Sequence, residues 1–260
     1  MPELPEVEIF RRYFERTSLQ QSVTQIDFLD DKVLSTDAAE IESALVNHTF
    51  FATTRIGKYL FAQIDSGKFL LFHFGMTGSL SYYQASIDPP KFSRLIIQFD
   101  TGYHLAFVCP RKFGRIELVT NLKEYQGKKK LGPDFLTIDK NGFKTAIQKR
   151  MTKIKPALLE QKHFAGIGNW IADEMLFQAK IHPERLCKSL TNRDLNLLFN
   201  SGIQTIEEAI AHDTHYGSFP DFMFVNHRKE GAKCPRCGAE VIRMVVGGRG
   251  TFICTKEQRA

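Results

Sequence analysis

Residues 121–137 read NLKEYQGKKKLGPDFLT, and they separate two halves of the chain that differ in the pattern of their apolar residues. The stretch contains a run of three lysines, two glycines and a proline, and its apolar residues follow no sustained period. Such a composition is typical of a segment that joins two domains. Because a chain of 260 residues is long enough for two cores, we predict an interdomain linker at 123–140.

The half before this linker is predicted to be an antiparallel β-sandwich. From residue 23 to residue 118, short β-branched and aromatic runs alternate with turn pairs such as Ser66-Gly67. An amphipathic helix precedes them, because apolar residues recur at spacings of three and four up to about residue 17. We therefore expect residues 1–122 to form an N-terminal domain that has one helix and a sandwich or flattened barrel.

The half after the linker is predicted to be helical. The segments that carry an apolar stripe are 143–151, 156–162, 170–179 and 192–211. Ahead of the last of them, Thr191 and Asp194 have the spacing of a capping box. We expect a helical domain at 141–221, followed at 222–260 by a short, strand-like tail that is too small to hold a core of its own.

The tail contains the residues of a metal site. Cys234 and Cys237 form a C-x2-C knuckle, and Cys254 follows after sixteen residues, which is the spacing of a two-knuckle zinc ribbon. The fourth ligand is expected at position 257, where the chain has Glu257. Zinc accepts carboxylate oxygen, but three thiolates and a glutamate are uncommon in a structural site. His227 as a substitute ligand, and a hairpin without zinc, are the alternatives.

The composition indicates a globular protein with a moderate preference for polyanions. Lys and Arg number 35 against 29 for Asp and Glu, which gives a net charge of +6. No apolar run approaches the roughly 20 residues that span a bilayer. Three of the five cysteines lie in the last 27 residues, so they do not form a secreted disulfide framework. We expect a cytoplasmic protein with no membrane partner.

Two glycine-containing segments are candidates for binding an anion. In GIGNWIADE, 166–174, Asn169 is placed to cap a helix that starts at Trp170, and the free N–H groups of a helix N-terminus attract anions. In GGRGT, 247–251, Arg249 occupies the tip of a turn where a guanidinium can approach phosphate. Neither segment is specific alone, because glycine turns between helices and solvated arginines are common.

Seven motifs, in order along the whole chain, carry a resemblance to a known family. They are PELPEVE at 2–8, GKYL at 57–60, HFGMTGSL at 73–80, PRKFG at 110–114, LGPDFL at 131–136, GIGNWIADE at 166–174 and GGRGTFIC at 247–254. The chain thereby resembles the formamidopyrimidine-DNA glycosylase and endonuclease VIII family of base-excision repair. The resemblance implies an α+β multidomain fold, with a catalytic N-terminal β-sandwich, a helix-two-turns-helix DNA-binding domain and a C-terminal zinc finger with structural zinc.

The resemblance also implies the catalytic residues. In this family the initiator methionine is removed, and the imino nitrogen of the new N-terminal proline, here Pro2, attacks C1′ of the damaged nucleotide. An α-amino group titrates near about 7.7–8.0 and a lysine near about 10.4, so an N-terminal amine is roughly a hundred times more often neutral at pH 7. The resulting iminium allows strand cleavage by β-elimination. The implied activity is therefore that of a bifunctional DNA glycosylase and abasic-site lyase.

Other residues receive their roles from the same resemblance. Glu3 is the acid/base group at the sugar, Lys58 is the second catalytic group, and Glu6 and Glu174 have supporting roles. Because a base inside duplex DNA is out of reach, such an enzyme extrudes the nucleotide and fills the hole. The residues that fill the hole are Met76, Arg111 and Phe113, and those that hold phosphates are Asn169, Arg249 and, as a further candidate, Lys155. The expected partner is double-stranded DNA with a damaged base or an abasic site, bound by a monomer.

The compact run 216–234 departs from the bacterial pattern, because it lacks the longer glycine-rich loop that covers an oxidised purine. Ring-opened purines, oxidised pyrimidines and abasic sites are therefore favoured over 8-oxoguanine, and β- versus β,δ-elimination stays open. A non-catalytic protein of the same fold that binds damaged DNA is the alternative function, and Pro2, Glu3 and Lys58 argue against it. A zinc-ribbon protein that acts on RNA is a weaker third reading, because it does not account for PELPEVE.

Overall fold

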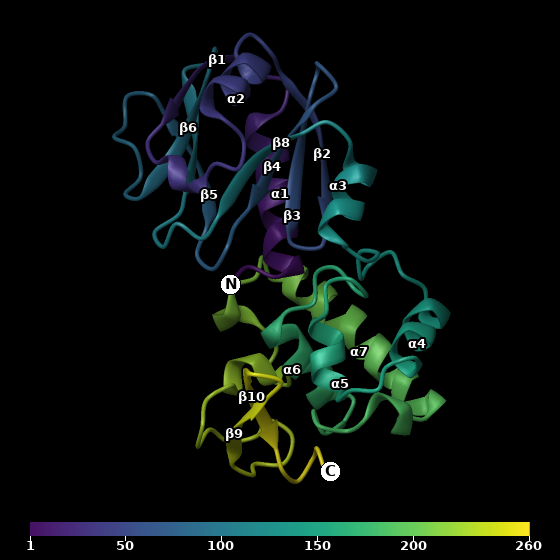
Figure 1. Ribbon diagram of the computed structural model, residues 1–260. Coiled ribbons are helices and arrows are strands. Elements are labelled where there is room, and N and C mark those ends of the chain that lie inside the picture. The colour runs from purple at the N-terminus through teal and green to yellow at the C-terminus, as the bar shows by residue number, and fades with distance from the viewer. Residues whose placement is uncertain (260) are drawn as a thin grey trace. The chain divides into compact units, whose positions relative to one another are not determined.

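The computed structural model describes residues 1–259, and the chain divides into two compact units (Figure 1). One unit contains residues 1–2 and 6–129, and the other contains residues 3–5 and the chain from Lys130 onward. The first helix, α1 (Leu4–Ser18), therefore begins in the second unit and continues in the first. Within the described residues, no helix combines the length and the apolar character needed to cross a membrane.

The first unit contains two four-stranded sheets in which every neighbouring pair is antiparallel. One sheet has the strand order β1 (Val23–Phe28), β6 (Ser93–Phe99), β7 (Tyr103–Val108), β5 (Ser79–Gln84), and the other has the order β2 (Phe50–Ile56), β3 (Tyr59–Ile64), β4 (Phe69–His73), β8 (Arg115–Val119). Apolar residues of both sheets form one buried core. The predicted antiparallel β-sandwich is confirmed.

Helices complete the first unit. Val7 and Phe14 of α1 are fully buried in the core of the sandwich, and the ring of Phe14 meets that of Phe50 edge-on, with centroids 5.2 Å apart. The predicted N-terminal amphipathic helix is thus present, and it ends one residue after the predicted end. A second helix, α2 (Ala38–Leu45), which the sequence did not predict because it is only eight residues long and lies among strands, begins after Asp37, whose side chain accepts the N–H of Ala39. A single turn of 3-10 helix, η1 (Asp31–Val33), lies before it.

A helix that the sequence did not predict lies in the proposed linker. The segment 123–140 overlaps α3 (Leu122–Lys129), and the division between the two units falls after Lys129. The side chain of Asn121 accepts the N–H groups at the start of α3, and Tyr125 packs its ring edge-on against Phe61. Tyr125 is the only buried residue of this helix. An apolar stripe is therefore missing, which is why periodicity failed to indicate a helix here.

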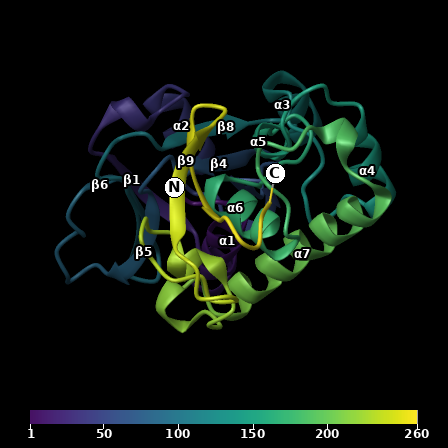
Figure 2. The same ribbon diagram turned by 90° about the horizontal axis from the view of Figure 1, so that it is seen from below.

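The second unit is helical and carries a strand pair at its end. Its elements are α4 (Lys140–Gln148), α5 (Ile154–Leu159), α6 (Asn169–Gln178), α7 (Asn192–Ala211), the short 3-10 helices η2 (Cys187–Ser189), η3 (Tyr216–Ser218) and η4 (Phe224–His227), and the hairpin strands β9 (Val241–Val246) and β10 (Arg249–Cys254). The predicted capping box is present at α7, where Thr191 and Asp194 exchange side-chain hydrogen bonds with each other's backbone N–H. Figure 2 shows α7 as the long helix of this unit.

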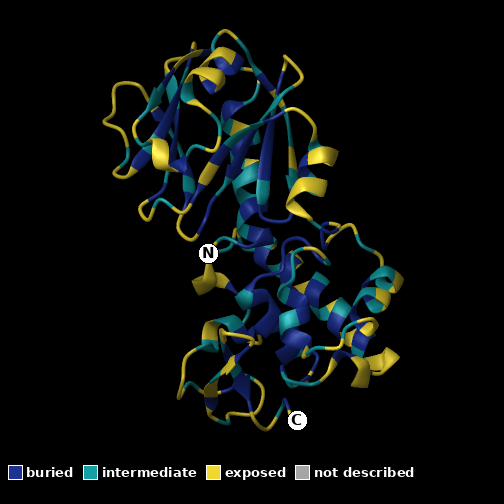
Figure 3. Ribbon diagram, in the orientation of Figure 1, coloured by how far each residue is buried: buried dark blue, intermediate teal, exposed yellow. Residues whose placement is uncertain are grey.

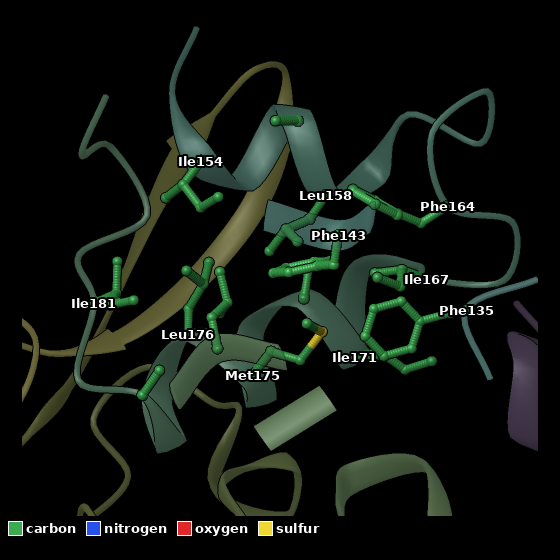
Figure 4. Packing of buried hydrophobic residues seen from close by; sticks show 14 of the residues in the cluster. Phe135, Phe143, Ile154, Leu158, Phe164, Ile167, Ile171, Met175, Leu176 and Ile181 are labelled. Carbon is green, nitrogen blue, oxygen red and sulfur yellow. The ribbon is translucent and has the colours of Figure 1, made fainter. Parts of the chain in front are cut away.

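Helix α6 lies in the middle of the second core. Every residue from Trp170 to Phe177 is buried, in keeping with the dark blue of this helix in Figure 3. Figure 4 shows Ile171 and Met175 of α6 among aromatic rings of the core, including Phe135 and Phe143. A helix that is buried on every side has no solvent face, so its polar residues need partners inside the protein. Those partners define the candidate site.

Candidate active site

The carboxylate of Glu3 caps the N-terminus of α6. Only 2% of Glu3 is exposed, and its Oε1 accepts the N–H of Trp170 at 3.0 Å while its Oε2 accepts the N–H of Ile171 at 3.2 Å. A helix N-terminus favours a negative charge because its first N–H groups have no partner within the helix. The anion site that the sequence predicted at this loop is therefore filled by the protein's own carboxylate. Its cap residue is Gly168, and Asn169 is the first residue of the helix.

Two glycines allow the N-terminal segment to reach this position. A Cβ at Gly168 would lie 2.1 Å from Cδ of Glu3, and a Cβ at Gly166 would lie 2.5 Å from a methyl carbon of Leu4. Gly166 also has φ +115, and its carbonyl accepts the N–H of Leu4 at 3.2 Å. The glycines of GIGNWIADE therefore make room for residues 3 and 4 of the same chain.

The side chain of Asn169 contacts the β9–β10 hairpin. Its Nδ2 donates to the carbonyl of Gly250 at 3.0 Å, and its Oδ1 is buried without a hydrogen-bond partner among the described residues. Lys155 donates to the same carbonyl at 3.2 Å and to Oγ1 of Thr251 at 2.7 Å. Because the side chain of Lys155 is fully buried, its contacts hold the hairpin rather than a phosphate.

Asp173 balances the charge of Lys155. Its Oδ1 lies 2.6 Å from Nζ of Lys155, its Oδ2 lies 2.8 Å from Nη2 of Arg228, and its side chain is fully buried. Burial lowers the pKa of Lys155 from its usual value, while the charge of Asp173 favours the protonated form. The backbone N–H of Phe252 also approaches Asp173, at 3.4 Å. The N-terminal half of α6 is thereby joined to β10.

Glu174 anchors the segment that leads into the hairpin. Its Oε1 accepts the N–H of Phe224 at 3.0 Å, and its Oε2 accepts the N–H of Val225 at 2.7 Å. Gln178 donates to Oε1 as well, at 2.7 Å. Burial raises the pKa of Glu174, which these donors oppose. A structural role for Glu174 agrees with these contacts.

Lys58 lies in the two-residue turn between β2 and β3. It is 8% exposed, and Gly57 before it has φ +58, a left-handed conformation that suits glycine. Nη1 of Arg55 donates to the Gly57 carbonyl at 3.0 Å, and Nε of Arg55 lies 3.1 Å from Oε2 of Glu8. A buried ion pair thus fixes the turn that presents Lys58.

His73 is a residue that the sequence reasoning missed. It ends β4 and begins the motif HFGMTGSL. Burial and then the charge of Lys58 lower its pKa to about 4, so the imidazole is neutral at pH 7. A neutral imidazole in the field of Lys58 is a candidate member of the site. Its place at the head of a motif was the available signal.

Met76, Arg111 and Phe113 lie on adjoining loops of the first unit and are exposed. Met76 is 41% exposed and Phe113 56%. The loops touch at Gly75, where a Cβ would lie 2.4 Å from the carbonyl carbon of Phe113. The two apolar side chains therefore do not belong to the core, which is the arrangement that a wedge for DNA needs.

Pro2 and Glu6 flank the segment that packs in the second unit. Pro2 is half-buried, directly precedes Glu3, and lies two residues before the first residue of α1, Leu4. Glu6 is half-buried in the first turn of α1. Because Glu3 is fixed by two hydrogen bonds, the residue next to it is tethered as well.

The three cysteines of the tail converge. Their Sγ atoms lie within 4.8 Å of one another, and the sulfurs of Cys237 and Cys254 are 3.5 Å apart. Three sulfur donors at this spacing suit zinc. The structure does not bring Glu257 into this group, because its carboxylate pairs with Arg236 at 3.1 Å and Lys180 at 3.2 Å.

Arg249 lies where the hairpin turns. Gly247 and Gly248 form the two-residue turn between β9 and β10, with φ +56 and +74, as a type I′ turn requires. Arg249 follows them and is exposed. His227, the alternative metal ligand, lies in η4 and outside the group of three thiols.

Family models match most of the chain. The model described as formamidopyrimidine-DNA glycosylase N-terminal domain matches residues 1–116, and the formamidopyrimidine-DNA glycosylase H2TH domain matches residues 131–220. A zinc finger described as found in FPG and IleRS matches residues 231–256.

Relatives and solved structures are similar over nearly the whole of this chain. A formamidopyrimidine-DNA glycosylase of Desulforamulus reducens is 35% identical over 277 residues, which cover 100% of both chains. One of Arabidopsis thaliana is 33% identical and is matched over 71% of its length by the whole of this chain. The Lactococcus lactis enzyme, solved bound to DNA with an abasic site, has a TM-score of 0.90 and 33% identity, and the match covers 99% of this chain and 100% of that chain. Its complex with FAPY-dG-containing DNA gives the same TM-score, 0.90, at 32% identity, over 99% of this chain and 100% of that chain.

Proposed function

Because the chain belongs to the formamidopyrimidine-DNA glycosylase family, and is thus a DNA glycosylase of base-excision repair, we propose that its first two residues after the initiator methionine carry the reaction. Abasic-site lyase activity is typical of this family. The observation that supports the proposal is the buried carboxylate of Glu3, which two N–H groups of α6 hold beside Pro2.

Pro2 is the proposed nucleophile. After removal of Met1, the neutral imino nitrogen attacks C1′ of the damaged nucleotide, the N–C1′ bond forms, and the glycosidic bond breaks as the base leaves with a proton. Once the proline nitrogen has given up its proton, its lone pair forms an iminium with C1′ as the C1′–O4′ bond breaks, and O4′ takes a proton so that the sugar ring opens. Loss of a proton from C2′ expels the 3′ phosphate by β-elimination, and water releases the sugar from the proline.

Glu3 and Lys58 are the proposed acid–base groups. Glu3 lies at the sugar, where its carboxylate stabilises the positive charge that develops as the glycosidic bond breaks. Two backbone donors orient this carboxylate. Lys58 protonates the leaving base or the leaving phosphate. His73, neutral at pH 7, adds no further positive charge near Lys58.

Contacts with duplex DNA are proposed for both units. Met76 and Phe113 enter the stack as apolar wedges, and the guanidinium of Arg111 pairs with the orphaned base. Arg249, exposed at the hairpin turn, binds a phosphate. Asn169 gives one amide hydrogen to Gly250 and thereby positions this turn, and its second hydrogen serves a phosphate.

We propose duplex DNA with a ring-opened purine or an abasic site as the substrate. Solved relatives bound to FAPY-dG and to abasic DNA support this choice. The protein acts as a monomer, and its five free thiols suit a reducing cytoplasm. The three cysteines of the hairpin hold a structural zinc, whose role is to fix the β9–β10 hairpin that presents Arg249.

Borohydride trapping on abasic duplex DNA tests the proposal. The wild-type enzyme should form a covalent protein–DNA adduct, because reduction fixes the iminium at Pro2. Pro2→Gly should lose most of the adduct. Mass spectrometry of the active protein should find the mature chain starting at Pro2. A wild-type protein that binds the abasic duplex tightly and forms no adduct would instead be a non-catalytic binder.

A further inference from the structure

At position 257 the metal site of the hairpin has a glutamate, where a four-thiolate site has its fourth cysteine. Cys234 and Cys237 come from the first knuckle, and Cys254 ends β10. Their sulfurs gather within 4.8 Å. Zinc in structural sites is four-coordinate, so a set of three sulfurs leaves one tetrahedral position for another donor.

The carboxylate of Glu257 forms ion pairs with two cationic side chains. Oε2 of Glu257 lies 3.1 Å from Nη1 of Arg236 and 3.2 Å from Nζ of Lys180, and the side chain is only 14% exposed. A carboxylate that bound zinc through this oxygen would give up both pairs. Arg236 and Lys180, which are both partly exposed, would then have lost Glu257 as the partner of their charges.

Arg236 is itself held on several sides. It lies between the two cysteines of the first knuckle, and its guanidinium is 4.5 Å from the ring centroid of Phe177. Nη1 also donates to the carbonyl of Phe177 at 3.3 Å, and Nη2 donates to Oε1 of Gln178 at 2.8 Å. The pair with Glu257 therefore ties the first knuckle, the end of α6 and the last turn of the chain together.

The turn that carries Glu257 closes without a metal bond. Gln258 is 1% exposed, and its N–H donates to the carbonyl of Cys254 at 2.9 Å. Its side chain accepts the N–H of Cys254 at 3.2 Å and donates to the carbonyl of Ile181 at 3.0 Å. Main-chain and side-chain amide hydrogen bonds of Gln258 thus fix the position of residue 257. In a four-thiolate ribbon, the bond from the fourth cysteine to the metal fixes this position.

We propose that zinc in this protein is bound by three thiolates and one solvent molecule, and that Glu257 forms an ion-pair clamp with Arg236 and Lys180 in place of the fourth metal bond. The clamp is defined by these three residues. The site is consequently open to a small external ligand at its fourth position. Cys237, which is exposed, lies on the accessible side of the group.

Zinc affinity of the full-length protein, measured by competition with a chromophoric chelator, tests the role of Glu257. Glu257→Gln keeps the shape of the side chain and removes its charge. We expect zinc affinity to fall by less than about tenfold, because Glu257 pairs with Arg236 and Lys180 and not with a thiolate, whereas loss of a direct outer-shell partner of a ligand costs about 10–100-fold. Hairpin amides should exchange hydrogen faster. A drop in affinity of more than about a hundredfold would make Glu257 a ligand and overturn the proposal. Glu240→Gln is the matched control, since Glu240 is exposed just before β9 and makes no ion pair within residues 1–259.

Cobalt substitution tests the open position. In the wild-type protein, imidazole should change the visible spectrum of bound cobalt(II), because it replaces solvent at the metal. Glu257→Cys supplies a fourth thiolate, so it should tighten zinc binding by about tenfold or more and make the cobalt spectrum insensitive to imidazole. A wild-type spectrum that imidazole leaves unchanged, or a wild-type protein that binds neither metal, would contradict the proposal. These readouts involve no DNA, so they stand or fall apart from the glycosylase reaction.

Discussion

Oε1 of Glu3 accepts the backbone N–H of Trp170 at 3.0 Å, although the two residues are separated by 167 positions in sequence. The contact sets the start of the chain against the N-terminus of a buried helix. A terminal segment is normally frayed unless something ties it down. Here the tie is a charge-assisted pair of hydrogen bonds, and it fixes the residue that follows Pro2.

Gly168→Ala tests this tie. The new Cβ would lie 2.1 Å from Cδ of Glu3, so the carboxylate must leave the helix N-terminus. We expect single-turnover base excision to fall by about 100-fold or more, the range that a misplaced acid–base group costs. Gly127→Ala in α3 is the control, because its Cβ would meet nothing within 4 Å. Unchanged excision by Gly168→Ala would show that the position of Glu3 does not matter to the reaction.

Asp173→Asn tests the buried charge pair. The substitution leaves the fully buried ammonium of Lys155 without its carboxylate, and breaking a buried pair from one side costs about 3–5 kcal/mol. Urea unfolding should show this loss. The double variant Lys155→Met with Asp173→Asn removes the stranded charge and should be more stable than Asp173→Asn alone. Equal stability of the two variants would mean that the pair is not coupled.

Glu8→Gln tests the pH dependence of stability. Burial opposes ionisation of Glu8, but Arg11, Arg12 and Arg55 outweigh it and lower its pKa from 4.5 to about 2. A carboxylate with a lowered pKa contributes stability that is complete above its unfolded pKa and is lost as the pH falls toward the folded value. The wild-type melting temperature should therefore fall from about pH 4.5 downward more steeply than that of Glu8→Gln. If calorimetry gives the same dependence of melting temperature on pH for both proteins, ionisation of Glu8 does not contribute to the acid sensitivity of the fold.

Phe113→Ala tests the wedge. Because the side chain is 56% exposed, folding stability should change by no more than about 0.5 kcal/mol. Fluorescence of 2-aminopurine opposite or beside the lesion should show weaker extrusion, and kcat/KM should fall by about tenfold or more, since the unstacked step loses its filler. Phe51→Ala provides the comparison, because Phe51 is also exposed, at 42%, but lies on β2. Equal effects of the two substitutions would argue against a wedge.

The sequence predicted a strand-rich first half and a helical second half, because apolar residues recur with a fixed period in strands and in amphipathic helices. It missed α2, a short helix inside the region that was predicted as strands, and α3, where Tyr125 alone is buried and no period exists. It also missed His73, whose altered pKa comes from burial and from Lys58, neither of which adjacency in sequence reveals.

The glycine loop shows the limit of motif reasoning most clearly. Free N–H groups at a helix start predict an anion, and the anion proved to be Glu3 of the same chain. Contacts across 167 positions carry no local signature. The carboxylate at position 257 is a similar case, because its partners Lys180 and Arg236 lie far from it in sequence. The roles of Pro2, Glu3 and Lys58 in catalysis stay predictions that the experiments above address.

The placement of residues 3–5 interleaves the two units along the chain. A protease nick after Lys129 would give two fragments. The amino-terminal fragment would carry Leu4, and the carboxyl-terminal fragment would contain the core into which Leu4 packs. Mixed together, the halves have a reason to reassociate, because the peptide that one lacks is the leading end of the other.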